Sequence, residues 1–340
     1  MSLRFLPLAF LIPLALSAQS HTLVVFHPGP HTIDELDPST GKVLRSLQVE
    51  DQPHEAVMTP DGKTIFASLP GPGKVVIIDG ATLTQTGAIS SEYFQAPPHP
   101  QGRKGQISTS ASPHALALNN AGTKLYVGLS YRESPGLVVY DLKAGKVLTK
   151  IALPVNGEFM AVQPGTDKLY IPNRQGLLVV DTKTDKLLKT ISLPGSPTGA
   201  DFAKNGDVWL SENGDGSITV LDSKKDEVIQ VIPTGGKGAG RMAVSPDGKL
   251  AAATHDTTED VMLIDTVKKE VVGTVNVGKG PSVPIFSPDS NRLYVITAGG
   301  PCSEGCPGNV VVVDAALKKV IGRYKVANDA FAVVLRTGAK

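Results

Sequence analysis

Short apolar runs that end in aspartate recur along the whole chain, and a polar turn follows each of them. The runs are TIDELD, VVIID, LVVYD, LLVVD, ITVLD, VMLID and VVVVD, and they end at Asp37, Asp79, Asp141, Asp181, Asp222, Asp265 and Asp314. Successive aspartates are 42, 62, 40, 41, 43 and 49 residues apart. A repeat of about 40 residues is typical of the blades of a β-propeller or of the units of a helical solenoid.

The residues within each repeat favour strands over helices. The chain holds 35 Gly and 26 Pro, and its Val, Ile and Thr stand in short runs broken by turn residues. Each repeat contains a small-residue run such as EAVM, a run with an aromatic near its start such as KLYVGL, the aspartate-terminated run, and a run such as KLLKTISL. We predict an all-β fold: a seven-bladed β-propeller of four-stranded antiparallel blades over residues 21–340.

The two ends of the chain predict how the ring closes. HTLVVFH, TIDELD and KVLRSLQV near the start match the second, third and fourth strands of a repeat, whereas AFAVVL at the end matches a first strand alone. Pairing the C-terminal strand with the N-terminal strands in one blade would cover two open sheet edges.

The aromatic strands LYVGL, LYIPN and LYVIT resemble those of the YVTN-repeat family of secreted seven-bladed β-propeller proteins. The resemblance covers nearly all of residues 21–340 and implies the seven-bladed fold. It implies little about function, because propellers of this kind serve many unrelated roles.

Residues 1–20 have the pattern of a signal peptide. Arg4 precedes an uncharged apolar run that ends at Leu16, and the small residues Ser17 and Ala18 follow it. The run is too short to span a bilayer, so we expect no membrane insertion. We expect an exported monomer, periplasmic or extracellular, in which Cys302 and Cys306 form a disulfide within one Gly/Pro-rich loop.

Charge argues against one class of partner. The chain has 33 basic and 32 acidic residues, so its formal net charge is only +1. Because so small a net charge gives little electrostatic attraction for the phosphate backbone, we predict no nucleic-acid binding.

The loops of such a fold lie on two opposite faces of the ring. Loops between second and third strands open on the same face as the links between blades, whereas the tight Pro-Asp-Gly turns open on the opposite face. The loop-rich face therefore carries most of the variable residues, including an insertion of about 20 residues between Ser90 and Ser112. Ligand-binding candidates on this face are Tyr93, Phe94, Arg132, Arg174 and His255.

The axial mouth on this face holds a second group of candidates. His54 and His114 begin the innermost strands of two repeats, where Glu158 and Thr198 stand in later ones, and Arg241 lies within one residue of the same ring. Such a ring could bind an anionic ligand or a divalent metal, with His54, His114 and Glu158 as metal ligands. Alternatively, the Pro-His pairs cap the inner strands and hydrogen-bond to a neighbouring blade. We expect no other cofactor.

Three functional hypotheses follow. The first is a non-catalytic scaffold that presents the loop-rich face and the axial mouth to a protein, peptide or cell-envelope ligand, and the lack of a catalytic motif favours it. The second is an enzyme, either a lactonase-like hydrolase or a metal-assisted lyase, with His54, His114, Glu158 and His255 as acid/base or metal-binding groups. The third is a redox partner similar to the haem-carrying propellers of the nitrite reductase type, which usually have eight blades.

Overall fold

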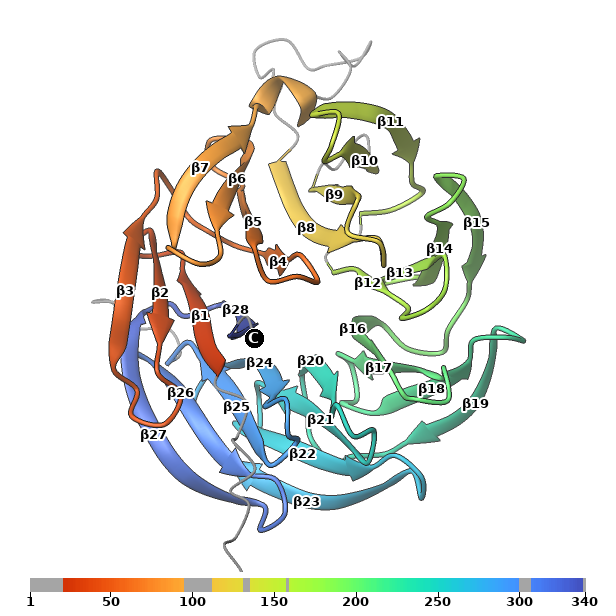
Figure 1. Ribbon diagram of the computed structural model, residues 1–340. Helices are drawn as coiled ribbons and strands as arrows, with labels where there is room; N and C mark the ends of the chain where they lie inside the picture. The colour runs from red at the N-terminus through yellow and green to blue at the C-terminus, as the bar shows by residue number, and fades with distance from the viewer. Residues whose placement is uncertain (1–20, 95–111, 131–134, 157–158, 300–306, 339–340) are drawn as a thin grey trace, which may run out of the picture.

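Seven four-stranded sheets stand in a ring around a central axis in the computed structural model (Figure 1). The structure describes residues 21–94, 112–130, 135–156, 159–299 and 307–338. Neighbouring strands within each sheet are antiparallel, and the first strand of each blade lies nearest the axis (Figure 1). The predicted seven-bladed all-β propeller is confirmed.

Six blades are continuous in sequence. The first two hold β4 (Ala56–Met58), β5 (Thr64–Leu69), β6 (Lys74–Asp79) and β7 (Thr84–Ile89), then β8 (Ser112–Leu118), β9 (Lys124–Ser130), β10 (Gly136–Asp141) and β11 (Lys146–Ala152). The next two hold β12 (Ala161–Val162), β13 (Lys168–Asn173), β14 (Gly176–Asp181) and β15 (Lys186–Ile191), then β16 (Pro197–Phe202), β17 (Val208–Glu212), β18 (Ile218–Asp222) and β19 (Glu227–Ile232). The last two hold β20 (Ala239–Val244), β21 (Leu250–His255), β22 (Asp260–Asp265) and β23 (Glu270–Asn276), then β24 (Pro281–Phe286), β25 (Arg292–Thr297), β26 (Pro307–Asp314) and β27 (Lys319–Asn328).

The seventh blade, which we name the closing blade, joins the two ends of the described chain. It consists of β28 (Ala332–Thr337), β1 (His21–His27), β2 (Thr32–Leu36) and β3 (Val43–Gln48), in that order from the axis outward. β28 pairs antiparallel with β1 from Phe26 opposite Ala332 to His21 opposite Thr337. The predicted closure between terminal strands is confirmed.

A buried carboxylate connects all four strands of the closing blade. Glu35 on β2 is 1% exposed, and it accepts a hydrogen bond from Thr22 on β1 at 2.7 Å. Its carboxylate also pairs with Arg45 on β3 at 2.8 Å and with Arg336 on β28. Each of the four strands therefore contributes one side chain to the same cluster.

The core lies between blades, where each sheet packs on the next. The third strands are buried on both faces, which explains why they are apolar without alternation. The aromatic position of the second strand is also buried between blades, and it is occupied by Phe66, Tyr126, Tyr170, Trp209 and Tyr294.

The repeated aspartates shape the turns that follow the third strands. In two blades, for example, one carboxylate oxygen of Asp79 accepts the N–H groups of Ala81 and Thr82, and Asp181 binds Lys183 and Thr184 in the same way. This is an Asx turn, and it accounts for the recurrence of aspartate without a chemical role.

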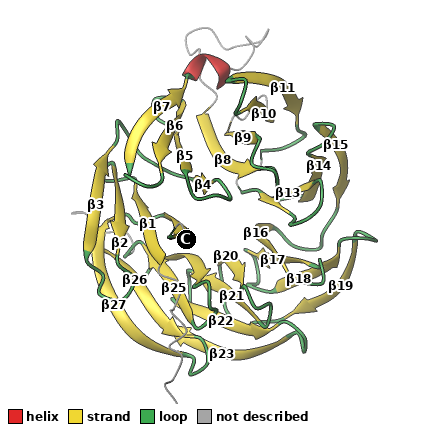
Figure 2. Ribbon diagram, viewed as in Figure 1, coloured by secondary structure: helices red, strands yellow, loops and turns green. Residues whose placement is uncertain are grey.

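Helical structure among the described residues is limited to the 3-10 turn η1 (Ser91–Phe94), which follows β7 (Figure 2). No helix in this part of the chain is long and apolar enough to cross a membrane.

Candidate functional site

Hydroxyl groups on the second strands position the inner ends of the neighbouring blades. Ser68 on β5 donates a hydrogen bond to the carbonyl of His114 in the next blade, with an O–O distance of 2.8 Å. Ser211 on β17 donates to Gly240 at 2.6 Å, and Thr254 on β21 donates to Ser282 at 2.9 Å. The start of an innermost strand is thus fixed by the blade before it, so the axial residues form a ring with a set spacing.

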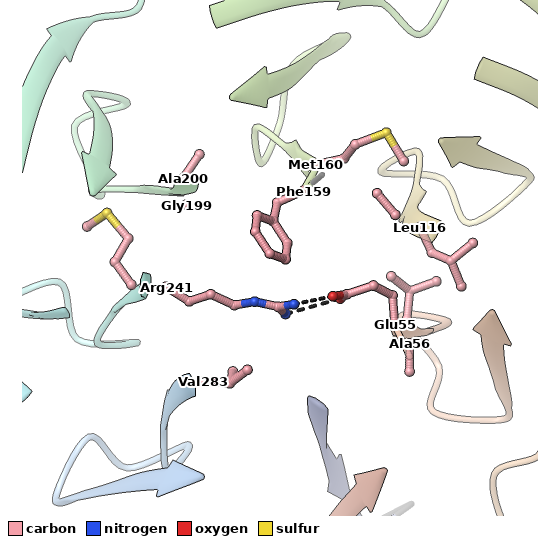
Figure 3. Close-up of a pocket in the computed structure, with 12 residues that line it drawn as sticks. Glu55, Ala56, Leu116, Phe159, Met160, Gly199, Ala200, Arg241 and Val283 are labelled. Atoms are coloured by element: carbon pink, nitrogen blue, oxygen red, sulfur yellow. Dashed lines mark hydrogen bonds and ion pairs between the residues drawn. The ribbon is translucent and has the colours of Figure 1, made fainter. Parts of the chain in front are cut away.

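An axial cavity of about 210 Å³ lies inside this ring. Arg241, on β20, reaches across the cavity to Glu55, which directly precedes β4 (Figure 3). The guanidinium pairs with both carboxylate oxygens, at 3.1 Å for one of the two contacts. Two blades separate the partners on one side of the ring and three on the other. The ion pair therefore spans the axis.

Aromatic rings hold the guanidinium of Arg241 in place. Its central carbon lies 4.0 Å from the centre of the Phe159 ring and 5.3 Å from that of Phe331. Both distances are within the range of cation–π attraction. The position of the cation therefore depends on two apolar neighbours as well as on Glu55.

The two predicted histidines of the axial ring are in contact. The rings of His54 and His114 have their centres 4.1 Å apart, and His54 also packs on Phe331 at 4.2 Å. The Nδ1 atoms of both histidines are buried and have no hydrogen-bond partner among the described residues. Burial, together with the nearby charges of His114 and Arg241, lowers the pKa of His54 to about 3. His54 is therefore neutral near pH 7 and a weak base.

The metal hypothesis rests on residues that the structure describes only in part. His54 and His114 are close together, but Glu158 lies outside the described residues. Within the described segments, no group of three or more His, Cys, Asp or Glu side chains is arranged to hold a metal ion. Metal binding at the axial mouth stays a prediction.

A second cavity, the interblade groove, opens on the loop-rich face and has a volume of about 730 Å³. It lies between the β12–β15 and β16–β19 blades. Its lining comes from the links before these blades, from the adjoining ends of β13 and β16, and from the loops between second and third strands: Val155, Asn156, Phe159, Pro172, Asn173, Arg174, Gln175, Ser196, Pro197, Thr198, Asn213 and Gly214. Phe159 also lines the axial cavity, so the two cavities are neighbours.

Local hydrogen bonds shape the loops of the interblade groove. The side-chain oxygen of Asn173 accepts the N–H of Gln175 at 2.8 Å, and Asp215 accepts the N–H of Ser217 at 2.9 Å. Gly176 has φ of 134°, and a Cβ there would lie 2.2 Å from the carbonyl oxygen of Ile191. Arg174, predicted as a ligand contact, stands exposed on this rim.

Other sequence candidates lie away from both cavities. Phe94 is fully buried in the core between two blades, and Tyr93 packs edge-on against Tyr140 with ring centres 6.0 Å apart. Both aromatic side chains of η1 thus contribute to blade packing.

His255 is fully buried beneath the loop-rich face. Its Nε2 lies 3.0 Å from the carbonyl oxygen of Gly216 and 3.1 Å from the hydroxyl of Thr234, and its Nδ1 lies 3.3 Å from Asp260. These contacts give it a role in holding loops together. Arg132 and the cysteines Cys302 and Cys306 lie outside the described residues.

Sequence reasoning missed Glu55 and Phe159, although a signal for Glu55 was present. Aligning the inner strands EAVM and RMAV places Glu55 and Arg241 at the same repeat position in two blades. Equivalent positions of a ring face the same axis, so opposite charges there are candidates for a pair.

Comparison with known proteins supports the fold and leaves the site open. A family model described as a domain of unknown function, DUF5074, matches residues 118–288. The seven-bladed beta-propeller protein Rv1057 of Mycobacterium tuberculosis is 26% identical over 124 residues. That match covers 36% of this chain and 30% of the relative, so the chain spans less than a third of the relative's length.

Solved structures resemble the chain over most of its length. A dihydro-heme d1 dehydrogenase NirN in complex with DHE has a TM-score of 0.65 and 16% identity, over 93% of this chain and 75% of the other. The hydrazine synthase of Kuenenia stuttgartiensis has a TM-score of 0.66 and 16% identity, over 84% of this chain and 96% of the other. A functionally unknown protein from Desulfotomaculum acetoxidans has a TM-score of 0.72 and 13% identity, over 94% of this chain and 99% of the other. At these identities the likeness shows the propeller fold alone.

Proposed function

The chain belongs to the DUF5074 family, whose model matches half of its length and assigns no activity; from its site, we propose that the protein is a non-catalytic binding scaffold. Its ligand is a protein or peptide segment, or a comparable cell-envelope ligand, held on the loop-rich face. Export to the periplasm or beyond is part of this proposal and rests on the signal-peptide pattern of residues 1–20. We further propose that the exported chain is a monomer.

The single observation that supports this function is the interblade groove. Its volume of about 730 Å³ can accept part of an extended chain, and its exposed polar lining includes Arg174, Gln175 and Asn213. Carboxamides both donate and accept hydrogen bonds, as the peptide backbone does. The loops are shaped by their own hydrogen bonds before any ligand arrives, which lowers the entropic cost of binding.

The axial groups support binding more than catalysis. With a pKa of about 3, His54 is a poor general base near neutral pH. Glu55 and Arg241 already satisfy each other, and His255, which the enzyme hypothesis places at the mouth, is buried among Gly216, Thr234 and Asp260. A lactonase-like or lyase mechanism therefore finds less support here than the scaffold.

Peptide selection tests the proposal. Peptides are selected from a random displayed library on the wild-type protein, and their affinities are compared with those for Arg174→Ala and Asn213→Ala. We expect at least about a tenfold loss of affinity, since a lost charged or amide contact in a binding site costs 1–2 kcal/mol or more. Lys63→Ala is the control, because Lys63 follows a Pro-Asp-Gly turn on the opposite face and its side chain is 81% exposed.

Two outcomes would contradict the scaffold. Selected peptides whose affinity is unchanged in both groove variants would place binding elsewhere. Turnover of lactones or other esters that is abolished by His54→Ala would support the enzyme hypothesis instead.

A further inference from the structure

Beyond the groove and its ligand, we propose that the axial cavity binds a small zwitterion of the amino-acid class, whose carboxylate replaces Glu55 on Arg241 while its ammonium replaces Arg241 on Glu55. This inference does not depend on what the interblade groove binds.

The charge of the lining selects this class of ligand. Among the described residues, Glu55 and Arg241 are the two charged residues that line the axial cavity, and the rest of that lining is Ala, Val, Leu, Phe, Met and Gly. A ligand with only a carboxylate would leave Glu55 without its partner in a poorly solvated site, and a ligand with only an ammonium would do the same to Arg241. A zwitterion compensates both charges at once.

The ion pair is built so that it can open. Among the described residues, the hydrogen-bond donor to the Glu55 carboxylate is Arg241, and Nδ1 of His54 lies 3.7 Å from one carboxylate oxygen. Glu35 in the closing blade, by contrast, is bound from three other strands. Exchange at Glu55 therefore requires the loss of one partner, which the ammonium of the ligand replaces.

Arg241 stays in place when its partner is exchanged. The ring of Phe159 lies 4.0 Å from the guanidinium and supports it independently of Glu55. The planar guanidinium can then offer two parallel N–H groups to a new carboxylate. A lysine would keep the charge without this geometry.

The size of the cavity limits the ligand. About 210 Å³ has room for several water molecules, and small residues border it, including Ala56, Ala115 and Ala200. The space suits a free amino acid with a short side chain or an ω-amino acid better than a peptide segment.

Titration of the purified protein tests the proposal. The probes are the common α-amino acids, β-alanine and 4-aminobutyrate, with acetate and ethylammonium as single-charge controls; affinity is measured by calorimetry and by the shift of the unfolding temperature. We expect at least one zwitterion to bind with Kd below about 1 mM and at least tenfold more tightly than either control.

Variants connect the binding to the ion pair. Glu55→Gln and Arg241→Lys should each weaken the zwitterion by at least tenfold, and the double variant Glu55→Gln/Arg241→Met, which has no unpaired charge, should not bind it. Unfolding temperatures show that each variant is folded. Arg174→Ala, in the interblade groove, should leave zwitterion binding unchanged, which separates this inference from the proposed function.

The inference is overturned if no probe zwitterion binds to the wild type below about 1 mM, or if acetate binds as tightly as the best zwitterion. Binding that persists in the folded double variant would also overturn it.

Discussion

Two regions of this propeller hold an arginine and a glutamate together, and their surroundings differ. In the closing blade, Glu35 is 1% exposed and is bound by one side chain from each of the three other strands. At the axis, Glu55 meets Arg241 across a cavity of about 210 Å³. The first contact lies within a four-stranded sheet, and the second borders the axial cavity. The same chemistry therefore closes the ring in one place and leaves an exchangeable contact in the other.

The strongest test of this comparison is Glu35→Gln. The change leaves Arg45 and Arg336 without the charge that pairs them, and we expect the free energy of unfolding to fall by about 3 kcal/mol. Chemical denaturation measures the loss. The control is Glu50→Gln, whose exposed pair with Lys74 should contribute less than about 1 kcal/mol. Equal losses of unfolding free energy in the two variants would contradict the role of Glu35 in closing the ring.

The axial pair should respond less strongly. Glu55→Gln leaves the cation of Arg241 partly buried but supported by two aromatic rings, so we expect a loss of about 2 kcal/mol in unfolding free energy. Adding Arg241→Met should recover most of this loss, because the unpaired charge is then gone. Failure to recover it would show that the pair stabilises the ring as Glu35 does.

The pH dependence of stability should differ in sign between the regions. Burial raises the pKa of Asp201, on axial strand β16, to about 6, although hydrogen bonds from the backbone N–H groups of Val244 and Phe202 act to lower it. The protonated Asp201 carboxyl stabilises the folded state relative to the unfolded state. This contribution to the free energy of unfolding is complete below pH of about 4 and is lost as the pH rises through 6. We expect a loss of about 1 kcal/mol over this range, reduced by partial contact with solvent, and a flat profile in Asp201→Asn.

Asp34 in the closing blade should behave in the opposite way. Burial acts to raise its pKa, but hydrogen bonds with His27 and Ser46 and the charge of His27 outweigh it and lower the pKa below 3.8. Its contribution is present above that value and is lost as the pH falls through the lowered pKa. Asp34→Asn should therefore reduce acid sensitivity below pH of about 4 and leave the range between 4 and 6 unchanged. Denaturation curves at several pH values measure both effects.

The smallest effects on stability are expected at the turns that the closing blade shares with the six blades that are continuous in sequence. Asp37 in the closing blade and Asp181 in a continuous blade make the same Asx turn. Replacement of either by alanine should cost about 1 kcal/mol or less. A clearly larger effect at Asp37 would show that the turn, and not only Glu35, takes part in ring closure. The measurement is the midpoint of denaturation.

Much of the fold could be predicted from local patterns. The aspartate-terminated strands predicted seven blades because each Asx turn and each strand is set by residues adjacent in sequence. Closure through AFAVVL followed from counting strands at the two ends, and the pairing of β28 with β1 confirms it. Phe94 and His255 show the limit of such patterns: their places on the loop-rich face were clear, but their burial depends on blades and loops distant in sequence.

The sequence by itself determined the period, the strand order and the closing pairing, because a strand that needs cover on both faces requires a neighbour on each side. Only the tertiary structure decided that Arg241 reaches Glu55, that His54 and His114 touch, and that a groove opens beside Phe159. These features depend on the inner radius of the ring and on side-chain packing across it, and the spacing of residues along the chain contains neither.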